Sequence, residues 1–170
     1  EGAAEGLAWC ASSDTLYGTA DGTLLALSSR SGLLVGPLSP PGVDLEGLAC
    51  DPVAGRLYGL GDSGSLWAYD LAGGSWSTVG DTGLVWADAG LAWDPTRGLL
   101  YALAAGQGDA LYRLDPATAA ASLVGPLGLA PPHGGGLAVL PSWRLPLPRP
   151  VFLDGFESGD AAAWDGGVEP

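Results

Sequence analysis

The chain lacks several residue types, and the absences narrow its class. Lys, Asn, Ile and Met do not occur in its 170 residues, and His occurs once. All four missing types have codons that begin with AA or AT, so a GC-rich bacterial genome explains their absence without any functional meaning. Six basic residues, all Arg, stand against 19 acidic ones, which gives a net charge of −13. Nucleic-acid binding needs clustered cations, so this class of partner is excluded.

Long apolar runs are also missing. Gly, Pro or Asp interrupts every hydrophobic stretch well before the ~20 residues that a membrane-spanning helix needs, so we expect no membrane insertion. Apolar residues nevertheless make up 47% of the chain, which excludes a disordered protein despite 29 Gly and 14 Pro. The chain begins at Glu1 without a signal-type segment, so we expect it to start at a processed end or inside a longer protein.

The most informative pattern in the sequence is a repeat of Gly-Leu-Ala. It occurs at Gly6, Gly47, Gly90 and Gly136, which are 41, 43 and 46 residues apart. Short apolar segments separated by Gly, Asp, Ser and Pro follow each glycine, so each unit is predicted to be a four-stranded antiparallel meander. The prediction is an all-β propeller with three blades and the first strand of a fourth. The blades cover residues 6–46, 47–89, 90–135 and 136–140, a Pro-rich linker covers 141–150, and a tail covers 151–170.

Three blades and one strand do not close a propeller, because closed rings have about four to eight blades. Three arrangements satisfy this limit: blades upstream of Glu1, assembly with further copies of the chain, or an open fragment. We favour upstream blades.

The third blade carries a family resemblance. Gly90-Leu91-Ala92-Trp93-Asp94-Pro95 opens it, and Leu111-Tyr112-Arg113-Leu114-Asp115-Pro116 and Leu123-Val124-Gly125 follow. This pattern resembles a family of bacterial extracellular propellers, whose repeats form a scaffold without shared catalytic residues. The tail 154–164 resembles a C-terminal motif of exported bacterial proteins, so a secreted or cell-surface location is expected.

The loops of a blade emerge at two opposite ends of the sheet. Each acidic residue in a loop is assigned to one of these two ends. Loops from strand two to three, and from strand four to the next blade, emerge at one end and form the longer, less repetitive set. Variable loops on a rigid scaffold are common binding sites. We therefore predict a protein or glycan partner at this acidic face, with the candidate contacts Asp44, Glu46, Asp62, Asp81, Trp86, Asp88 and Asp109. Asp21 and His133 belong to the same end, whereas Arg30, Arg56 and Arg97 belong to the opposite one.

Trp86 is the best single candidate contact, because it falls in a loop beside acids and an exposed aromatic ring can stack on a sugar. Trp9, Trp67 and Trp93 fall on strands, where we expect them to be buried between blades. The alternatives to a non-catalytic binding module are a fragment of a polysaccharide hydrolase or lyase, using carboxylates such as Glu46 and Asp88, and a purely structural repeat.

The two cysteines, Cys10 and Cys50, occupy non-equivalent positions in neighbouring opening strands. This offset places them either in one seam between blades or both pointing away from it. We favour two buried free thiols over a disulfide. No cofactor is expected; a weak calcium site formed by Asp154, Glu157 and Asp160 in the tail would be incomplete.

Overall fold

The computed structural model describes residues 4–20, 22–38, 42–104, 110–128 and 136–139. It confirms an all-β fold of three four-stranded antiparallel sheets, which are the predicted blades. Blade 1 consists of β1 (Ala4–Cys10), β2 (Thr15–Ala20), β3 (Thr23–Ser28) and β4 (Leu34–Leu38). Blade 2 consists of β5 (Leu45–Asp51), β6 (Arg56–Gly61), β7 (Ser65–Asp70) and β8 (Ser75–Asp81). Blade 3 consists of β9 (Gly90–Asp94), β10 (Leu99–Ala104), β11 (Ala110–Leu114) and β12 (Ala121–Pro126).

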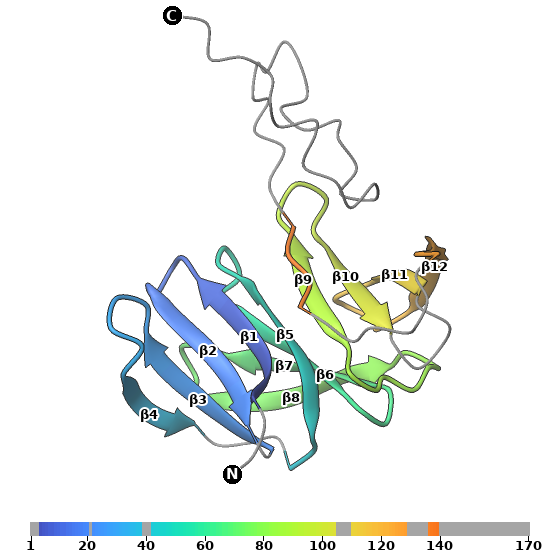
Figure 1. Ribbon diagram of the computed structural model, residues 1–170. Coiled ribbons are helices and arrows are strands. Elements are labelled where there is room, and N and C mark those ends of the chain that lie inside the picture. Colours follow the sequence, from blue (N-terminus) through green and yellow to red (C-terminus); the bar gives the residue numbers. More distant parts are fainter. Residues whose placement is uncertain (1–3, 21, 39–41, 105–109, 129–135, 140–170) are drawn as a thin grey trace, which may run out of the picture.

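The three blades form an arc, and the first strand of each blade lies on its inner side. In every sheet the strands follow in sequence order, and β1 lies beside β5, which lies beside β9 (Figure 1). The fourth strands β4, β8 and β12 are the outer edges and are mostly exposed. In the part of the chain that the structure describes, no helix is long and apolar enough to cross a membrane.

The repeated glycines permit the close approach of the inner strands. A Cβ atom on Gly47 would lie 2.9 Å from the carbonyl oxygen of Ala89 and 3.0 Å from the Cβ of Leu91, in the next blade. A Cβ on Gly6 would lie 3.1 Å from the backbone nitrogen of Leu48. These positions have no room for a side chain, so the Gly-Leu-Ala repeat follows from the packing of one blade on the next.

Each blade packs through two faces, and the core consists of the two seams between blades. We call the face of a blade that meets the preceding blade its leading face, and the opposite one its trailing face. In the first seam, Ala8, Tyr17 and Ala26 of blade 1 pack against blade 2. The leading face of blade 2 carries six apolar residues, one or two from each strand: Leu48, Cys50, Leu57, Trp67, Tyr69 and Trp76.

The second seam repeats this arrangement. Tyr58 of blade 2 stacks on Trp93 of blade 3, with ring centroids 5.8 Å apart and an interplanar angle of 17°. The trailing face of blade 2 consists of Ala49, Tyr58, Leu60, Leu66 and Ala68. The leading face of blade 3 consists of Leu91, Trp93, Leu100, Tyr112, Leu114 and Ala121.

The cysteines correct the expectation of free thiols. Cys10 and Cys50 form a disulfide that joins β1 to β5, with their Cα atoms 5.4 Å apart, a separation that a disulfide can span. The pairing is possible because Cys10 ends the trailing side of β1 while Cys50 lies on the leading side of β5, so both point into one seam. Disulfides persist in oxidising compartments and are rare in reducing ones, so the bridge is typical of an extracellular-type environment.

Two further expectations differ from the structure. Trp9 is not buried between blades: 58% of its surface is exposed, because its equivalents Cys50 and Trp93 contact a preceding blade and the described chain supplies none for Trp9. The described residues 136–139 form no strand. Gly136 and Leu137 instead line a small space on the axis of the arc together with Gly6 and Leu7.

Candidate functional site

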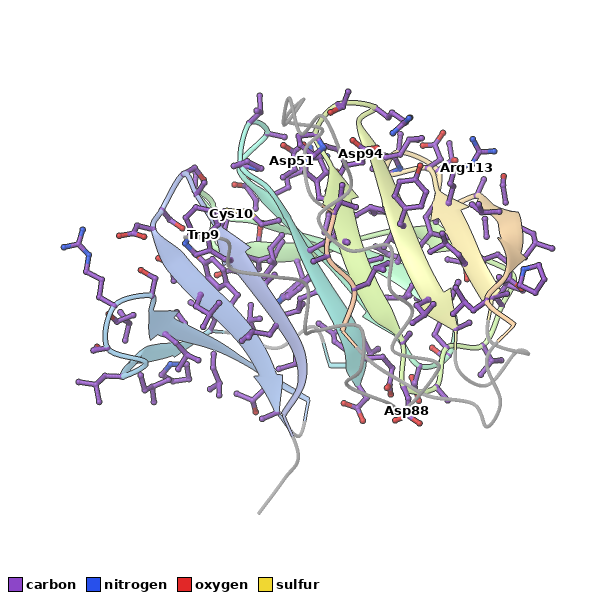
Figure 2. All side chains as sticks on the ribbon, turned by 45° about the horizontal axis from the view of Figure 1, so that its top comes forward. Trp9, Cys10, Asp51, Asp88, Asp94 and Arg113 are labelled. Carbon is purple, nitrogen blue, oxygen red and sulfur yellow. A yellow bond between two sulfur atoms is a disulfide. The ribbon has the colours of Figure 1, made fainter. Side chains whose placement is uncertain are left out.

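The acidic residues divide between the two ends of the sheets as the meander predicts. Figure 2 shows Asp88 at one end and Asp51 and Asp94 at the other. We call the first end the acidic loop face and define it by Asp44, Glu46, Asp62, Asp81 and Asp88, all of which lie in or beside the loops that emerge there. The opposite end is the turn face.

Glu46 is the electrostatic centre of the acidic loop face. Its Oε2 accepts a hydrogen bond of 2.9 Å from the backbone N–H of Asp88, which belongs to the loop before blade 3. Partial burial is the main cause that raises the pKa of Glu46. The hydrogen bond from Asp88 opposes this shift, and the nearby negative charges of Asp44, Asp88 and Asp62 add to it. Three of the predicted carboxylates are therefore close enough to Glu46 to repel its negative charge.

Hydrogen bonds hold the backbone of these loops together. The N–H of Asp62 donates to the carbonyl of Asp44 at 3.3 Å, and the N–H of Trp86 donates to the carbonyl of Asp62 at 3.0 Å. The Asp81 carboxylate accepts the N–H of Gly83 at 2.8 Å. Loops from two blade junctions and one hairpin thus form a connected surface.

Thr82 is the residue that organises the 82–89 loop, and sequence reasoning missed it. It is 8% exposed, and its hydroxyl donates to the carbonyl of Gly64 at 2.9 Å. The same oxygen accepts the indole N–H of Trp86 at 2.8 Å and the N–H of Leu84 at 3.3 Å. A threonine directly after Asp81 and two residues before Leu84 is a local turn signal that was available in the sequence.

The expectation that Trp86 is an exposed contact is wrong. Its side chain is completely buried and meets Tyr112 edge-to-face with ring centroids 5.5 Å apart. The indole has one polar atom, and Thr82 satisfies it inside the core. Trp86 therefore anchors the acidic loop to blade 3 and offers no ring to a ligand.

Carboxylates at the turn face have a different role. Asp94 accepts the N–H groups of Thr96 and Arg97 with one oxygen and the Arg97 guanidinium at 2.9 Å with the other. The Arg97 hydrogen bond is the main cause that lowers the pKa of Asp94. Asp70 accepts the N–H groups of Ala72 and Gly73, which lower its pKa. Asp51 and Asp115 close equivalent turns in the same way.

The ion pairs of the described residues are also at the turn face. Arg97 pairs with Asp94, and Arg30 lies 3.6 Å from Asp14. Within the described ranges, no ion pair forms at the acidic loop face, and no group of three or more His, Cys, Asp or Glu side chains is arranged to hold a metal ion. Asp21, Asp109, His133 and the predicted calcium ligands Asp154, Glu157 and Asp160 lie outside the described residues.

Comparison with known proteins supports the fold. No protein-family model and no curated protein matches the sequence. A chain in the crystal structure of a nidogen/laminin complex is similar at 20% identity and a TM-score of 0.61, covering 74% of this chain and 49% of that one. Hydrazine synthase of Kuenenia stuttgartiensis is similar at 16% identity and a TM-score of 0.55, covering 71% of this chain and 34% of that one. The chain therefore spans half or less of these structures, which it resembles in its propeller-like arrangement of sheets.

Proposed function

We propose that the protein is a non-catalytic, extracellular binding module whose acidic loop face binds a protein partner through a basic surface on that partner. The observation that carries the proposal is the convergence of three carboxylates, Asp44, Asp62 and Asp88, on the partly buried Glu46, which they repel. Like charges held together without a cation are destabilising when the protein is alone. A cationic partner relieves this repulsion, so part of the electrostatic free energy becomes binding free energy.

The rigidity of the loops supports this proposal. The acidic loops are tied to the blades by Thr82, by the buried Trp86 and by the Asp88–Glu46 hydrogen bond. Carboxylates on a surface that is already ordered lose little conformational entropy on binding. The net charge of −13 also increases the rate of encounter with a basic protein.

A protein partner fits this surface better than a glycan does. The argument for sugar binding depended on Trp86, which is buried. Among the described residues of these loops, the exposed large hydrophobic side chain is Val85, at 57%, which can contribute an apolar contact beside the charges. A glycan remains the second class of ligand to be tested.

The extracellular location is supported by two independent observations. The Cys10–Cys50 disulfide is typical of oxidising compartments. The tail at residues 154–164 resembles a motif of exported proteins. Periplasmic, surface and secreted fractions of the native cells, probed with an antibody to the protein, would test this part of the proposal, and recovery in the cytoplasm would contradict it.

The binding proposal is tested with a pair of variants that have equal net charge. One carries Glu46→Gln, Asp62→Asn and Asp88→Asn on the acidic loop face; the control carries Asp14→Asn, Asp70→Asn and Asp115→Asn on the turn face. Each is immobilised and exposed to lysine- and arginine-rich peptides, basic proteins and a glycan panel. We expect the first variant to lose at least tenfold in affinity for the basic probes and the control to lose much less. Equal losses would mean that only the net charge matters and would refute a localised site.

One observation favours the alternative of a glycoside hydrolase. Glu46 has a raised pKa and is hydrogen-bonded to the Asp88 backbone, and a carboxylic acid with a raised pKa is one half of the pair that such enzymes use. Release of reducing ends from a polysaccharide panel, abolished by Glu46→Gln, would establish this activity. No turnover by the folded wild-type protein would remove it.

A further inference from the structure

The leading face of blade 1 is an apolar sheet surface that no described residue covers. Its six positions are the equivalents of the six that blades 2 and 3 pack, buried or partly buried, in their seams, and all are apolar: Leu7, Trp9, Leu16, Leu25, Leu27 and Leu34. Leu7, Trp9 and Leu34 are 63%, 58% and 57% exposed. Leu48 and Leu91, the equivalents of Leu7, are 2% and 3% exposed. Blade 1 is therefore built for a seam that the described chain does not form.

The six residues form one continuous surface. A Cβ placed on Gly18 would meet the Leu7 side chain at 3.6 Å and the Leu27 side chain at 4.0 Å, so these two leucines extend over the same side of β2. Leu34 pairs with Leu27 as Trp76 pairs with Tyr69 in blade 2. An exposed apolar patch of this kind marks an interaction surface on a soluble protein.

We propose that this face binds the trailing face of blade 3 in a second copy of the chain, so that two chains form a closed, head-to-tail, six-bladed ring. A head-to-tail contact needs two different, complementary surfaces on one molecule. Six blades fall within the range in which propellers close. The proposal concerns a surface separate from the acidic loop face and does not depend on the function proposed for it.

Blade 3 carries the residues that cover a leading face. Tyr101 is the equivalent of Tyr58 in blade 2, the residue that stacks on Trp93. Ala92, the equivalent of Ala49, is already buried within the single chain. Trp9 is the equivalent of Trp93, so a second copy would place Tyr101 on Trp9 and repeat the same aromatic pair. Leu103 and Leu111, equivalents of Leu60 and Leu66, complete the apolar part of this trailing face.

The one departure from the pattern is compensated across the proposed junction. The exposed Arg113 stands where blades 1 and 2 have Ala26 and Ala68, so this trailing face is larger at that point. In the first seam, the small Ala26 shares its cluster with the large side chains of Trp67, Tyr69 and Trp76. At the same positions blade 1 has three leucines, Leu25, Leu27 and Leu34, which are smaller and leave volume for the arginine stem.

Residues 136–139 do not cover the outer part of this trailing face. They form no strand, and Gly136 and Leu137 lie at the axial space beside Gly6 and Leu7. The sheet surface around Tyr101 and Arg113 on β10 and β11 thus has no fourth blade over it within the described chain. Figure 2 shows Trp9 on blade 1 and Arg113 on blade 3, the two outer blades of the arc.

Light scattering during size-exclusion chromatography tests the proposal on the 170-residue chain. The wild type is expected to have the mass of two chains. Trp9→Asp and Tyr101→Asp, on the two sides of the junction, should each have the mass of one chain, whereas Val53→Asp, a control in a fully exposed turn (91% exposed), should stay dimeric. Thermal melts verify that each variant is folded; if Tyr101→Asp is not, Arg113→Glu replaces it on the same face.

Mixing the two interface variants identifies the geometry. A ring of one Trp9→Asp chain and one Tyr101→Asp chain has one junction with both substitutions and one with neither. The mixture should therefore recover mass of two chains, while each variant alone does not. A monomeric wild type, a dimer that survives both substitutions, or a mixture that stays monomeric would overturn the proposal. The first outcome would assign the face to a blade outside this sequence. A Tyr101→Asp variant that stays dimeric while Trp9→Asp does not would also overturn the proposal and would assign the contact to two Trp9 faces.

Discussion

The two ends of the blades use the same kind of residue for opposite purposes. At the turn face, Asp94 and Asp70 accept backbone N–H groups of their own turns, and their pKa values are lowered. At the acidic loop face, burial and neighbouring charge raise the pKa of Glu46. The turn-face carboxylates accept hydrogen bonds within the scaffold, whereas Glu46 at the acidic loop face is repelled by the carboxylates near it.

This difference shows why counting acidic residues is a poor guide to function. A carboxylate that accepts two N–H groups in a repeated turn is part of the scaffold, and its negative charge is already compensated. A carboxylate whose ionised form is disfavoured remains available to a partner. Among the carboxylates, those of the turn face should therefore contribute to stability, and those of the acidic loop face to binding.

The largest expected effect concerns the disulfide at the turn-face ends of β1 and β5. Cys10→Ser with Cys50→Ser opens a crosslink across a sequence separation of 40 residues, which should lower the free energy of unfolding by about 4 kcal/mol. Urea denaturation of the double variant, compared with the wild type with and without reductant, measures this loss. If the variant is as stable as the oxidised wild type, the turn-face end does not hold blades 1 and 2 together.

Thr82→Val tests what fixes the acidic loops. It removes a buried hydroxyl and leaves the Trp86 indole N–H without a partner, while the Gly64 carbonyl keeps its hydrogen bond from the Thr82 backbone N–H, so we expect a loss of about 1–3 kcal/mol. Amide hydrogen exchange should rise in residues 82–88 before it rises in the seams. The exposed Thr78→Val is the matched control and should change neither quantity.

Gly47→Ala examines the inner strand below the acidic loops. The added methyl group meets the Ala89 carbonyl and Leu91, and overpacking of this kind lowers stability by about 1–3 kcal/mol. Gly36→Ala has no atom within 4 Å of the new Cβ and should be nearly neutral. Thermal unfolding separates the two, and equal melting temperatures would disprove the close approach of the blades.

Asp94→Ala tests how the turn-face carboxylates contribute to stability, because its effect on the melting temperature should depend on pH. Because the folded-state pKa of Asp94 is lowered, its contribution to stability is present above the ordinary Asp pKa and is lost as the pH falls through the folded-state value. We expect the variant to melt several degrees below the wild type at pH 7. The difference should shrink as the pH falls below about 4, towards the folded-state pKa. A difference that does not change with pH would contradict a role for the ionised Asp94 carboxylate.

The smallest expected effect has the opposite sign. The pKa of Glu46 is raised, so its ionisation reduces stability as the pH rises through the unfolded-state and folded-state values. Glu46→Gln keeps an acceptor for the Asp88 N–H and removes the repelled charge, and should therefore raise stability at pH 7 by less than about 1 kcal/mol. Chemical denaturation at pH 7 and pH 4 checks this, since the gain should vanish at the lower pH.

Much of the fold was predictable from the sequence because the same pattern of residues occurs three times and forms the same four-stranded sheet each time. Gly47 and its equivalents, the Tyr17, Tyr58 and Tyr101 series and the Asp-Pro turns each have one structural explanation. The burial of Trp86 was not predictable, since it depends on a hydrogen bond to Thr82 and a ring contact with Tyr112 of the next blade. The exposure of Trp9 and the disulfide depend on which blade faces which, and a pattern within one blade does not contain that information.

The carboxyl pKa values, followed residue by residue by NMR as the pH is changed, test the division between the two faces most directly. We expect Asp94 and Asp70 to titrate below the ordinary range of aspartate, and Glu46 to titrate above that of glutamate. A titration of Glu46 at or below its ordinary pKa, or of Asp94 and Asp70 at theirs, would contradict the division of roles between the acidic loop face and the turn face.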